Sequence, residues 1–438
     1  MISSGKHPGN SGICVQGFSK DQFSVRTERQ VEVKVLVVSQ YFPPERPTIA
    51  AAIARGLADK GHEVRVLTGF PNYPEGKVFP GYKQKWRSKE QHGEVEVLRV
   101  PLWADHSTSP VRRILNYASF AFTSSTARGF AKDADVIYVY ATQMTPALGP
   151  WVWEKFRGAP YVLHVQDLWP DSILESSMVA NSKAGRIIHA ILEPWLRSVY
   201  ASASGVIGIA PTMVQTLVKR GSEESKTALV YNWAHDSSPD GSSEKSTTKT
   251  EVLFAGNLGE MQDLETVVRS AKLVEDIPVA ITIVGDGLVR ESVMALAEEL
   301  GTSNINFRGS VPREEMFEIY ASADFSLVTL RDLEVFRGTI PSKFQASIAH
   351  GVPIITTVQG DLRGLIEEHK IGFTAEAEDV ESLAQAMRSA HSLSSEDYSE
   401  LQKRTRRVYL HHFSRHAGID AVETVLTQAA STSKDKDN

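Results

Sequence analysis

The 438-residue chain contains one cysteine, Cys14, so it cannot form an internal disulfide framework and suits a reducing compartment. No apolar run approaches the roughly 18 to 20 residues that a membrane-spanning helix needs. The sequence also lacks the G-x-G-x-x-G dinucleotide motif and any His/Cys cluster with zinc-site spacing. The pI is near 6.1 and there is no concentrated basic and aromatic stripe, so nucleic acid is not an expected partner.

Polar segments divide the chain, whose 42% hydrophobic and 23% charged residues are enough for two sizeable cores. Residues 1–30 have no signal-peptide apolar region and are expected to form a flexible N-terminal extension. The stretch "HDSSPDGSSEKSTTKT", residues 235–250, is the expected linker. The remaining expected parts are a first domain (31–234), a second domain (251–408), a C-terminal helix packing back towards the first domain (409–430) and a flexible tail (431–438).

Short runs rich in Val, Ile and Leu alternate with helical stretches in both halves. Examples are VKVLVVS (33–39) and DVIYVYA (135–141) in the first half, and EVLFAG (251–256) and VAITIVGDG (279–287) in the second. Continuous apolar runs of this kind predict parallel sheets covered on both faces. We therefore expect an α/β protein with two doubly wound halves, whose ligands bind in a cleft at the carboxyl ends of the strands.

Charge is unevenly distributed along the chain. Residues 31–230 contain 23 Lys and Arg against 18 Asp and Glu, whereas residues 231–438 contain 20 against 33. The basic first half is consistent with an anionic partner or surface. Chance, combined with solvated helix faces, explains the asymmetry equally well.

The stretch "GTIPSKFQASIAHGVPII", residues 338–355, predicts a helix whose first turn receives an anion. Pro341 suits a first helical turn because its missing N–H is not needed there. The turn presents free backbone N–H groups and about half a positive charge, to which Lys343 adds a full one. The alternative is that Lys343 is an ordinary surface lysine.

Several ordered motifs together resemble the retaining glycosyltransferases of family 4. They are YFPPE, GLADKGHEVRVLTGFPNYPEGKVFPGY (56–82), HVQDLWPDS (164–172), AGNLGEMQDLETVV (255–268), IVGDG (283–287), NFRGSVPREEMFEIYASADFSLVTL (306–330) and TIPSKFQASIAHGVPII. The similarity covers roughly residues 33–413, and it is strongest to the branch that builds bacterial capsule and O-antigen, including N-acetylfucosamine transferases. It implies the GT-B fold, with two Rossmann-like domains facing a cleft, the acceptor mainly on the first and the nucleotide sugar mainly on the second.

The resemblance implies a donor site in the second domain. Lys343, Ser342 and the helix start would hold the diphosphate, and Gln345 would bind the ribose. Backbone at Gly256 and Asn257 would approach the phosphates, and the FRGSV turn would meet the base. The full set of implied donor residues is Gly256, Asn257, Gln262, Asp286, Arg308, Arg337, Gly338, Pro341, Ser342, Lys343 and Gln345.

Four positions depart from the family pattern. Gln345 replaces a usual glutamate, and a neutral hydrogen bond in place of a charged one should weaken donor binding roughly tenfold. The other reading of Gln345 is a polar residue on a solvent-facing side of the helix. Asn257 and, approximately, Gln262 stand where many relatives have an arginine and a lysine for the donor phosphates. Arg337 stands where a first acid is usual, and with Lys343 it is the nearest substitute cation.

In the first domain, Asp167 is the candidate carboxylate that orients the acceptor or stabilises the developing oxocarbenium ion. Trp169 either forms a sugar platform or caps its loop. His164 is expected in the core, and His62 is read as a turn residue. The loop after the first strand should approach the donor phosphate or the acceptor through Pro44, Glu45 and Thr48.

The stretch "SPVRRILNYASFAFTSSTARGF", residues 109–130, is an apolar, aromatic helix that begins with Arg112 and Arg113. It either docks on an anionic membrane or is a core helix of the first domain. No metal is expected, because the Asp-x-Asp match at 133–135 precedes a strand instead of following one.

The expected function is transfer of a sugar from a nucleoside diphosphate, UDP before others, to a polyprenyl-diphosphate saccharide, without a metal or other cofactor. The expected location is the cytoplasm, at the inner face of the cytoplasmic membrane. Two alternatives remain, a nucleotide-sugar epimerase on the same fold and a non-catalytic partner of an active transferase.

Overall fold

The structure is a computed structural model, and it describes residues 32–45, 48–106, 109–169, 183–234 and 249–437. The expected N-terminal extension (1–30) and most of the expected linker (235–250) lie outside the described residues. The linker's last residue, Thr250, is already the first residue of a strand.

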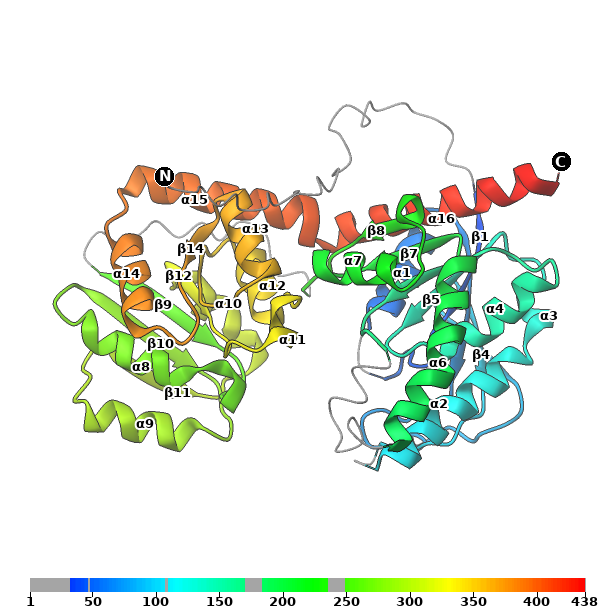
Figure 1. The fold of residues 1–438 in the computed structure, drawn as a ribbon, viewed down its shortest axis with the longest axis horizontal. Helices are drawn as coiled ribbons and strands as arrows, with labels where there is room; N and C mark the ends of the chain where they lie inside the picture. Colours follow the sequence, from blue (N-terminus) through cyan, green and yellow to red (C-terminus); the bar gives the residue numbers. More distant parts are fainter. Residues whose placement is uncertain (1–31, 46–47, 107–108, 170–182, 235–248, 438) are drawn as a thin grey trace, which may run out of the picture. The chain divides into compact units, whose positions relative to one another are not determined.

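Within the described residues, eight strands form the first sheet (Figure 1). They are β1 (Lys34–Val38), β2 (Glu63–Gly69), β3 (Ser88–His92), β4 (Val95–Val100), β5 (Val136–Ala141), β6 (Tyr161–Val165), β7 (Gly205–Gly208) and β8 (Thr227–Leu229). Their order is β3-β4-β2-β1-β5-β6-β7-β8, and each neighbouring pair is parallel except β3 with β4. The strands expected from the sequence are thus parallel, and the edge strand β3, with the polar sequence SKEQH, is an antiparallel addition that pairs with β4 through a tight turn.

Helices connect the strands of the first half, and α1 shows how the sequence sets their ends. The hydroxyl of Thr48 accepts a hydrogen bond from the N–H of Ala51 and so caps α1. Gly61, with φ of 89°, lets the chain turn back into β2. The helices are α1 (Ile49–Asp59), α2 (Pro110–Ser125), α3 (Arg128–Ala131), α4 (Leu148–Lys155), α6 (Lys183–Ser202) and α7 (Pro211–Lys219).

The second sheet repeats the arrangement with six parallel strands among the residues described. They are β9 (Thr250–Ala255), β10 (Val279–Val284), β11 (Ile305–Gly309), β12 (Phe325–Val328), β13 (Ile354–Thr356) and β14 (Gly372–Thr374), in the order β11-β10-β9-β12-β13-β14. This order corresponds to β4-β2-β1-β5-β6-β7 of the first sheet, so the prediction of two doubly wound α/β halves is confirmed. The helices of this half are α8 (Leu264–Leu273), α9 (Arg290–Glu299), α10 (Met316–Ala321), α11 (Glu334–Arg337), α12 (Ser342–Ala349), α13 (Asp361–His369), α14 (Val380–His391) and α15 (Ser395–Val408).

The chain ends in a π-helical turn, η6 (Tyr409–Phe413), followed by the long helix α16 (Arg415–Asp437). Side chains of α16 join the core under the first sheet, where Val422 and Leu426 pack with strand residues such as Val35. The helix continues beyond residue 430, where we expected a flexible tail, because no glycine or proline interrupts residues 431–437.

His62 contacts Glu423 of α16 and so links this helix to the first half, in addition to lying at a turn. Its side chain is buried, with Nδ1 accepting a hydrogen bond from the N–H of Val33 at 3.2 Å and Nε2 lying 2.9 Å from a carboxylate oxygen of Glu423. Lys60 binds the same carboxylate at 2.6 Å.

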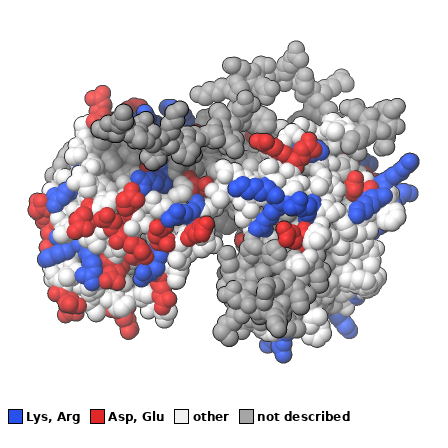
Figure 2. All heavy atoms as spheres, in the orientation of Figure 1, with Lys and Arg blue, Asp and Glu red and all other residues white. Residues whose placement is uncertain are grey.

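Acidic side chains crowd the part of the surface that carries α8, α9 and α14, with basic ones between them (Figure 2). This distribution agrees with the acidic count of the second half of the sequence. No described helix combines the length and apolar character that crossing a lipid bilayer requires.

Candidate active site

Glycines let the loops after β9 and β10 pack directly against each other. Gly256 has φ of 143° and Gly285 has φ of 139°, in the region that favours glycine. A Cβ on Gly285 would lie 1.9 Å from the carbonyl oxygen of Gly256. The N–H of Gly256 donates a hydrogen bond to the backbone carbonyl of Val284, and the N–H of Leu258 donates one to the backbone carbonyl of Asp286, both at 2.9 Å. The carboxyl edge of the second sheet is thus lined by closely packed backbone.

Lys343 reaches into this edge from the first turn of α12. Its Nζ lies 3.8 Å from the centroid of the Phe254 ring and donates a hydrogen bond to Oε1 of Gln262. A Cβ on Gly256 would lie 2.5 Å from its Cε, so the glycine makes room for the lysine. Burial lowers the pKa of Lys343 to about 7. Within the described residues no carboxylate forms an ion pair with this ammonium group.

The helix that carries Lys343 begins without a side-chain cap. Pro341, expected within the first turn, is instead the residue just before it, with extended backbone. Ser342 is exposed, and no side chain of the described residues accepts a hydrogen bond from the first amides of α12. An uncapped helix start next to a lysine without a described ion-pair partner is a combination that suits an anion.

The other expected donor residues lie on loops and helices of the same half. Asn257, Asp286 and Arg308 are exposed, whereas Gln262 is half-buried at the end of the 3-10 turn η4 (Glu260–Gln262). Asp286 accepts a hydrogen bond from the N–H of Gly287 at 2.8 Å.

Arg337, expected as a substitute cation, is paired with Asp332 in the structure. Its guanidinium donates to both carboxylate oxygens of Asp332, at 3.0 and 3.1 Å, so its charge is compensated. Gly338 is the residue that ends α11 directly after it. Gln345 is half-buried on α12, which leaves both interpretations of its side chain open.

The carboxyl edge of the first sheet surrounds a hollow of about 610 Å³. Aromatic residues dominate its wall, and two pairs of them are in ring contact. The centroids of Tyr41 and Tyr73 lie 5.4 Å apart, and those of Tyr73 and His106 lie 4.8 Å apart. The hollow is also lined by Glu45, Thr48, Arg113, Tyr117, Tyr140, Gln143, Asp167 and Trp169. Flat rings that carry polar groups at their edges suit a saccharide.

Glu45 organises the loops that form one wall of this hollow. Its carboxylate accepts three backbone hydrogen bonds, from Phe42 at 3.0 Å, Asn72 at 2.7 Å and Tyr73 at 2.9 Å. Burial raises its pKa, and the three N–H groups oppose that effect. Glu45 therefore joins the loop after β1 to the loop after β2.

Asp167 follows β6, and its side chain opens into the hollow. Although the residue is exposed, the surrounding walls limit its hydration and raise the pKa of its carboxyl group. Among the lining residues it is the carboxylate that is not held by neighbouring backbone N–H groups in the described structure, in contrast to Glu45. This location is compatible with the orienting role expected for it.

Trp169 is a core residue more than a surface platform. It is 6% exposed and packs in the core of the first half, although its edge reaches the hollow. His164 is fully buried, as expected, and its Nδ1 is 2.6 Å from the Tyr138 hydroxyl. Burial lowers the pKa of His164 to about 3, which favours its neutral form near pH 7.

The two arginines at the start of α2 have different surroundings. Arg113 lines the hollow, whereas Arg112 is exposed and lies 3.6 Å from the carboxylate of Asp105. Helix α2 also has two apolar faces. Phe120 and Ala121 are buried in the core, while Ile114, Leu115 and Phe122 are 41%, 48% and 64% exposed. The core interpretation is confirmed for the face that carries Phe120 and Ala121, and docking of the other face on a membrane stays a prediction.

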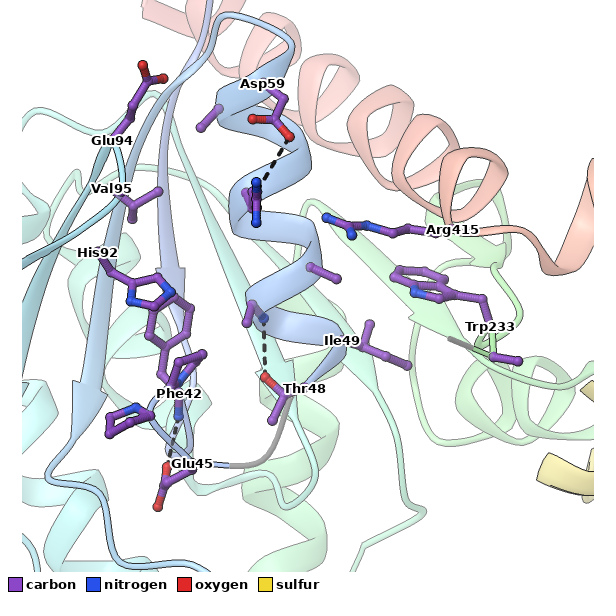
Figure 3. A pocket seen from close by; sticks show the side chains of 18 residues that line it. Phe42, Glu45, Thr48, Ile49, Asp59, His92, Glu94, Val95, Trp233 and Arg415 are labelled. Atoms are coloured by element: carbon purple, nitrogen blue, oxygen red, sulfur yellow. Dashed lines mark hydrogen bonds and ion pairs between the residues drawn. The ribbon is translucent and has the colours of Figure 1, made fainter. Parts of the chain in front are cut away.

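A larger hollow of about 970 Å³ lies along α1 (Figure 3). Phe42 and His92 stand on one side of the helix, and the side chains of Trp233 and Arg415 point towards it from the other. Pro44 lines this hollow and not the aromatic one, while Glu45 and Thr48 line both. Its wall lacks the converging strand ends that mark ligand sites in doubly wound sheets.

The Asp-x-Asp pair has a structural role in the described residues. One carboxylate oxygen of Asp135 accepts the N–H of Lys34 at 2.9 Å and so closes the start of β1. Among the described residues no three His, Cys, Asp or Glu side chains gather as metal ligands would.

Two family models match the chain. The Glycosyl transferase 4-like domain matches residues 47–233, and Glycosyl transferases group 1 matches residues 239–408. The chain belongs to the GT-B glycosyltransferases of family 4, which are transferases of the EC 2.4 class.

Among curated relatives, the chain is 28% identical to a protein of Escherichia coli (strain K12) named as a colanic acid biosynthesis glycosyl transferase, WcaI, over 84% of this chain and 96% of WcaI. It is 24% identical to the glycosyltransferase WbjE of Pseudomonas aeruginosa over 63% of this chain and 70% of WbjE. Sucrose-phosphate synthase from Thermosynechococcus elongatus shares the fold, with a TM-score of 0.65 and 15% identity over 92% of this chain and all of that one. The structure of the Anabaena protein HepE in complex with UDP and glucose matches with a TM-score of 0.58 and 15% identity, over 90% of this chain and all of the HepE chain.

Sequence reasoning missed the tyrosine wall and the Phe254 ring. Tyr41, Tyr73 and Tyr140 lie far apart in the sequence, and each follows a strand or lies next to its last residue. That placement after strands was a usable signal, because the carboxyl ends of parallel strands converge. Phe254 lies within β9 and gave no such signal, since a strand aromatic is ordinarily a core residue.

Proposed function

We propose that the chain is a retaining glycosyltransferase of surface polysaccharide biosynthesis, which moves a sugar from a nucleoside diphosphate to a lipid-linked saccharide. The observation that carries the donor half of this proposal is the partly buried ammonium of Lys343, which has no carboxylate partner among the described residues. A buried charge without a counter-ion is costly, and a diphosphate would supply the missing charge. UDP is the first nucleotide to test.

The donor would lie across the carboxyl edge of the second sheet. Lys343, Ser342 and the first amides of α12 would hold the diphosphate, and Gln345 would bind the ribose. The close packing at Gly256 and Gly285 leaves backbone, not side chains, facing the phosphates. Asn257, Asp286 and Arg308 remain candidates at the rim of the same edge, the last two towards the base.

The acceptor would occupy the aromatic hollow of the first sheet. Its volume of about 610 Å³ is within the usual range for small-ligand sites. Tyrosine rings would stack on the sugar, and Asp167 would accept a hydrogen bond from the acceptor hydroxyl. The relatives' role in colanic acid biosynthesis supports a saccharide acceptor of this kind.

A lipid carrier is supported by the two faces of α2. The helix turns Arg113 and Tyr117 towards the hollow and exposes Ile114, Leu115 and Phe122. Trp86 and Trp103 add exposed aromatic surface in the same half, at 56% and 58%. A membrane-bound diphosphate carrier would meet arginine next to apolar side chains, so we propose peripheral contact with the cytoplasmic face of the membrane.

In the proposed transfer the bond between the anomeric carbon and the phosphate oxygen breaks, and its electron pair leaves with the nucleoside diphosphate. The acceptor oxygen forms the new bond on the same face of the sugar, and its proton passes to the departing phosphate. The lysine and the helix amides would stabilise the charge that develops on the leaving group. Loss of one well-placed group of this kind costs about 10² to 10³ in rate. We propose no metal in this step.

The test compares Lys343→Gln with Asp167→Asn, using Lys403→Gln as a control on an exposed lysine of α15. Calorimetry with UDP and GDP should show at least about tenfold weaker nucleotide binding for Lys343→Gln and none of this loss for the control. Asp167→Asn should bind nucleotide normally but transfer sugar about 10²-fold more slowly to a polyprenyl-diphosphate saccharide in vesicles.

Two other outcomes would redirect the proposal. Interconversion of a free nucleotide sugar without acceptor would identify an epimerase. Failure of the wild-type protein to bind any nucleoside diphosphate would indicate a non-catalytic partner. Unchanged turnover of Lys343→Gln would exclude the donor site as described.

A further inference from the structure

Lys343 and Gln262 come from different elements and meet at the tips of their side chains. Lys343 belongs to α12, and Gln262 ends the turn η4 that follows β9. Both backbones are fixed. The carbonyl of Lys343 accepts the Ser347 hydroxyl at 2.7 Å, and the carbonyl of Gln262 accepts the Thr329 hydroxyl at 2.5 Å. Two rigid elements therefore bring a cation and an amide to one point.

The chemistry of the contact keeps the lysine's charge available. An ammonium group has three N–H donors, and the amide oxygen of Gln262 takes one of them. The Phe254 ring, 3.8 Å from Nζ, offers a second electron-rich surface without a formal charge. A neutral acceptor and a ring hold the ammonium in place but leave its positive charge for a ligand. A carboxylate at position 262 would cancel that charge.

We propose that Gln262 is a positioning residue that holds the Lys343 ammonium over Phe254 without neutralising it, and that the same charge works equally well when delivered from position 262. The inference deepens the proposed donor site and rests on it. It adds that the site requires one cation at this point in space, regardless of the element that carries it.

The first experiment changes only the charge and shape of residue 262. Gln262→Glu keeps the length of the side chain and its bond to Lys343, but pairs the ammonium with a carboxylate. Gln262→Ala removes the support and keeps the charge free. UDP affinity, measured by calorimetry at low salt, should fall about tenfold or more in Gln262→Glu and only about threefold in Gln262→Ala. A merely structural role predicts the opposite order, because glutamate preserves the packing and alanine does not.

The second experiment exchanges the two side chains. Lys343→Gln alone should weaken UDP binding at least about tenfold, and the double variant Gln262→Lys/Lys343→Gln should return to within about threefold of the wild type. Melting temperatures of all variants would confirm that each folds. A double variant as weak as Lys343→Gln, in a protein whose wild type binds UDP, would overturn the inference while leaving the proposed function intact. If the wild-type protein bound neither UDP nor GDP, that result would instead contradict both the inference and the proposed function.

Discussion

The two sheets have corresponding strand orders, but their two edges have diverged to different degrees. At the amino edge the resemblance is close. Asp135, before β5, accepts the N–H of Lys34 at 2.9 Å, and Asp324, before β12, accepts the N–H of Glu251 at 2.8 Å. At the carboxyl edge the first sheet carries tyrosines around a hollow, and the second carries glycines packed around Lys343. The comparison teaches that the two amino edges share one hydrogen-bonding arrangement, whereas the two carboxyl edges, where we propose that ligands bind, carry different side chains.

The largest expected difference is in the stability cost of replacing two glycines that lie at corresponding strand ends. Gly285 follows β10, and a Cβ there would lie 1.9 Å from a backbone carbonyl oxygen at φ of 139°. Gly69 ends β2, and a Cβ there would meet the movable end of Leu102 at 2.2 Å. Gly285→Ala should destabilise the fold by about 3 kcal/mol or more and abolish nucleotide binding, because backbone must move. Gly69→Ala should cost clearly less in urea unfolding and leave nucleotide affinity unchanged.

A smaller effect, specific to the second edge, is a pH dependence of nucleotide affinity. Burial lowers the pKa of Lys343 to about 7, and a bound diphosphate would favour its charged form. UDP affinity should therefore decrease as pH rises above 7, approaching about tenfold per pH unit if only the charged form binds. Working above pH 7 keeps the terminal phosphate of UDP ionised throughout.

The lowered pKa of Lys343 also affects the stability of the ligand-free protein, which should rise with pH where nucleotide affinity falls. Between about pH 7 and the ordinary lysine range the unfolded chain binds more protons at this site than the folded one. The contribution of Lys343 to stability should therefore improve as pH rises through that window. Lys343→Gln should remove both the affinity slope and this stability slope. A slope that persists in the variant would assign the titration to another group.

The smallest effect tests the similarity of the amino edges. Asp135→Asn and Asp324→Asn each weaken one charge-assisted hydrogen bond to an amide in the first two residues of a strand, and each should lower the free energy of unfolding by about 1 kcal/mol. Neither should alter UDP binding or transfer. Unequal losses would show that these two carboxylates do not serve the same purpose in the two halves.

Much of the fold could be predicted from the sequence, because buried parallel strands leave continuous apolar runs. Polar or very short strands could not be predicted, since SKEQH of β3 and GFT of β14 carry little of that signal. The length of α16 was also underestimated, because a polar helix end resembles a tail in composition.

The site was predictable where one local motif defines it and unpredictable where distant residues converge. The helix start at Lys343 was visible in a single stretch, and the structure adds that its ammonium rests between Phe254 and Gln262. The ion pair between Arg337 and Asp332 could not be predicted, because it depends on the backbone path between these two residues. The tyrosine wall depends on strand order, which no local pattern encodes.

Helix α16 means that the first half of the fold is not built from a continuous segment. A fragment ending at residue 234 would uncover the strand faces that Ile419, Val422, Leu426 and Ala429 protect, and would leave His62 without its carboxylate. Such a fragment should aggregate, whereas supplying residues 415–437 as a separate peptide should rescue it. Anyone dividing this enzyme into halves for study must therefore cut it in two places and keep its last helix with its first strands.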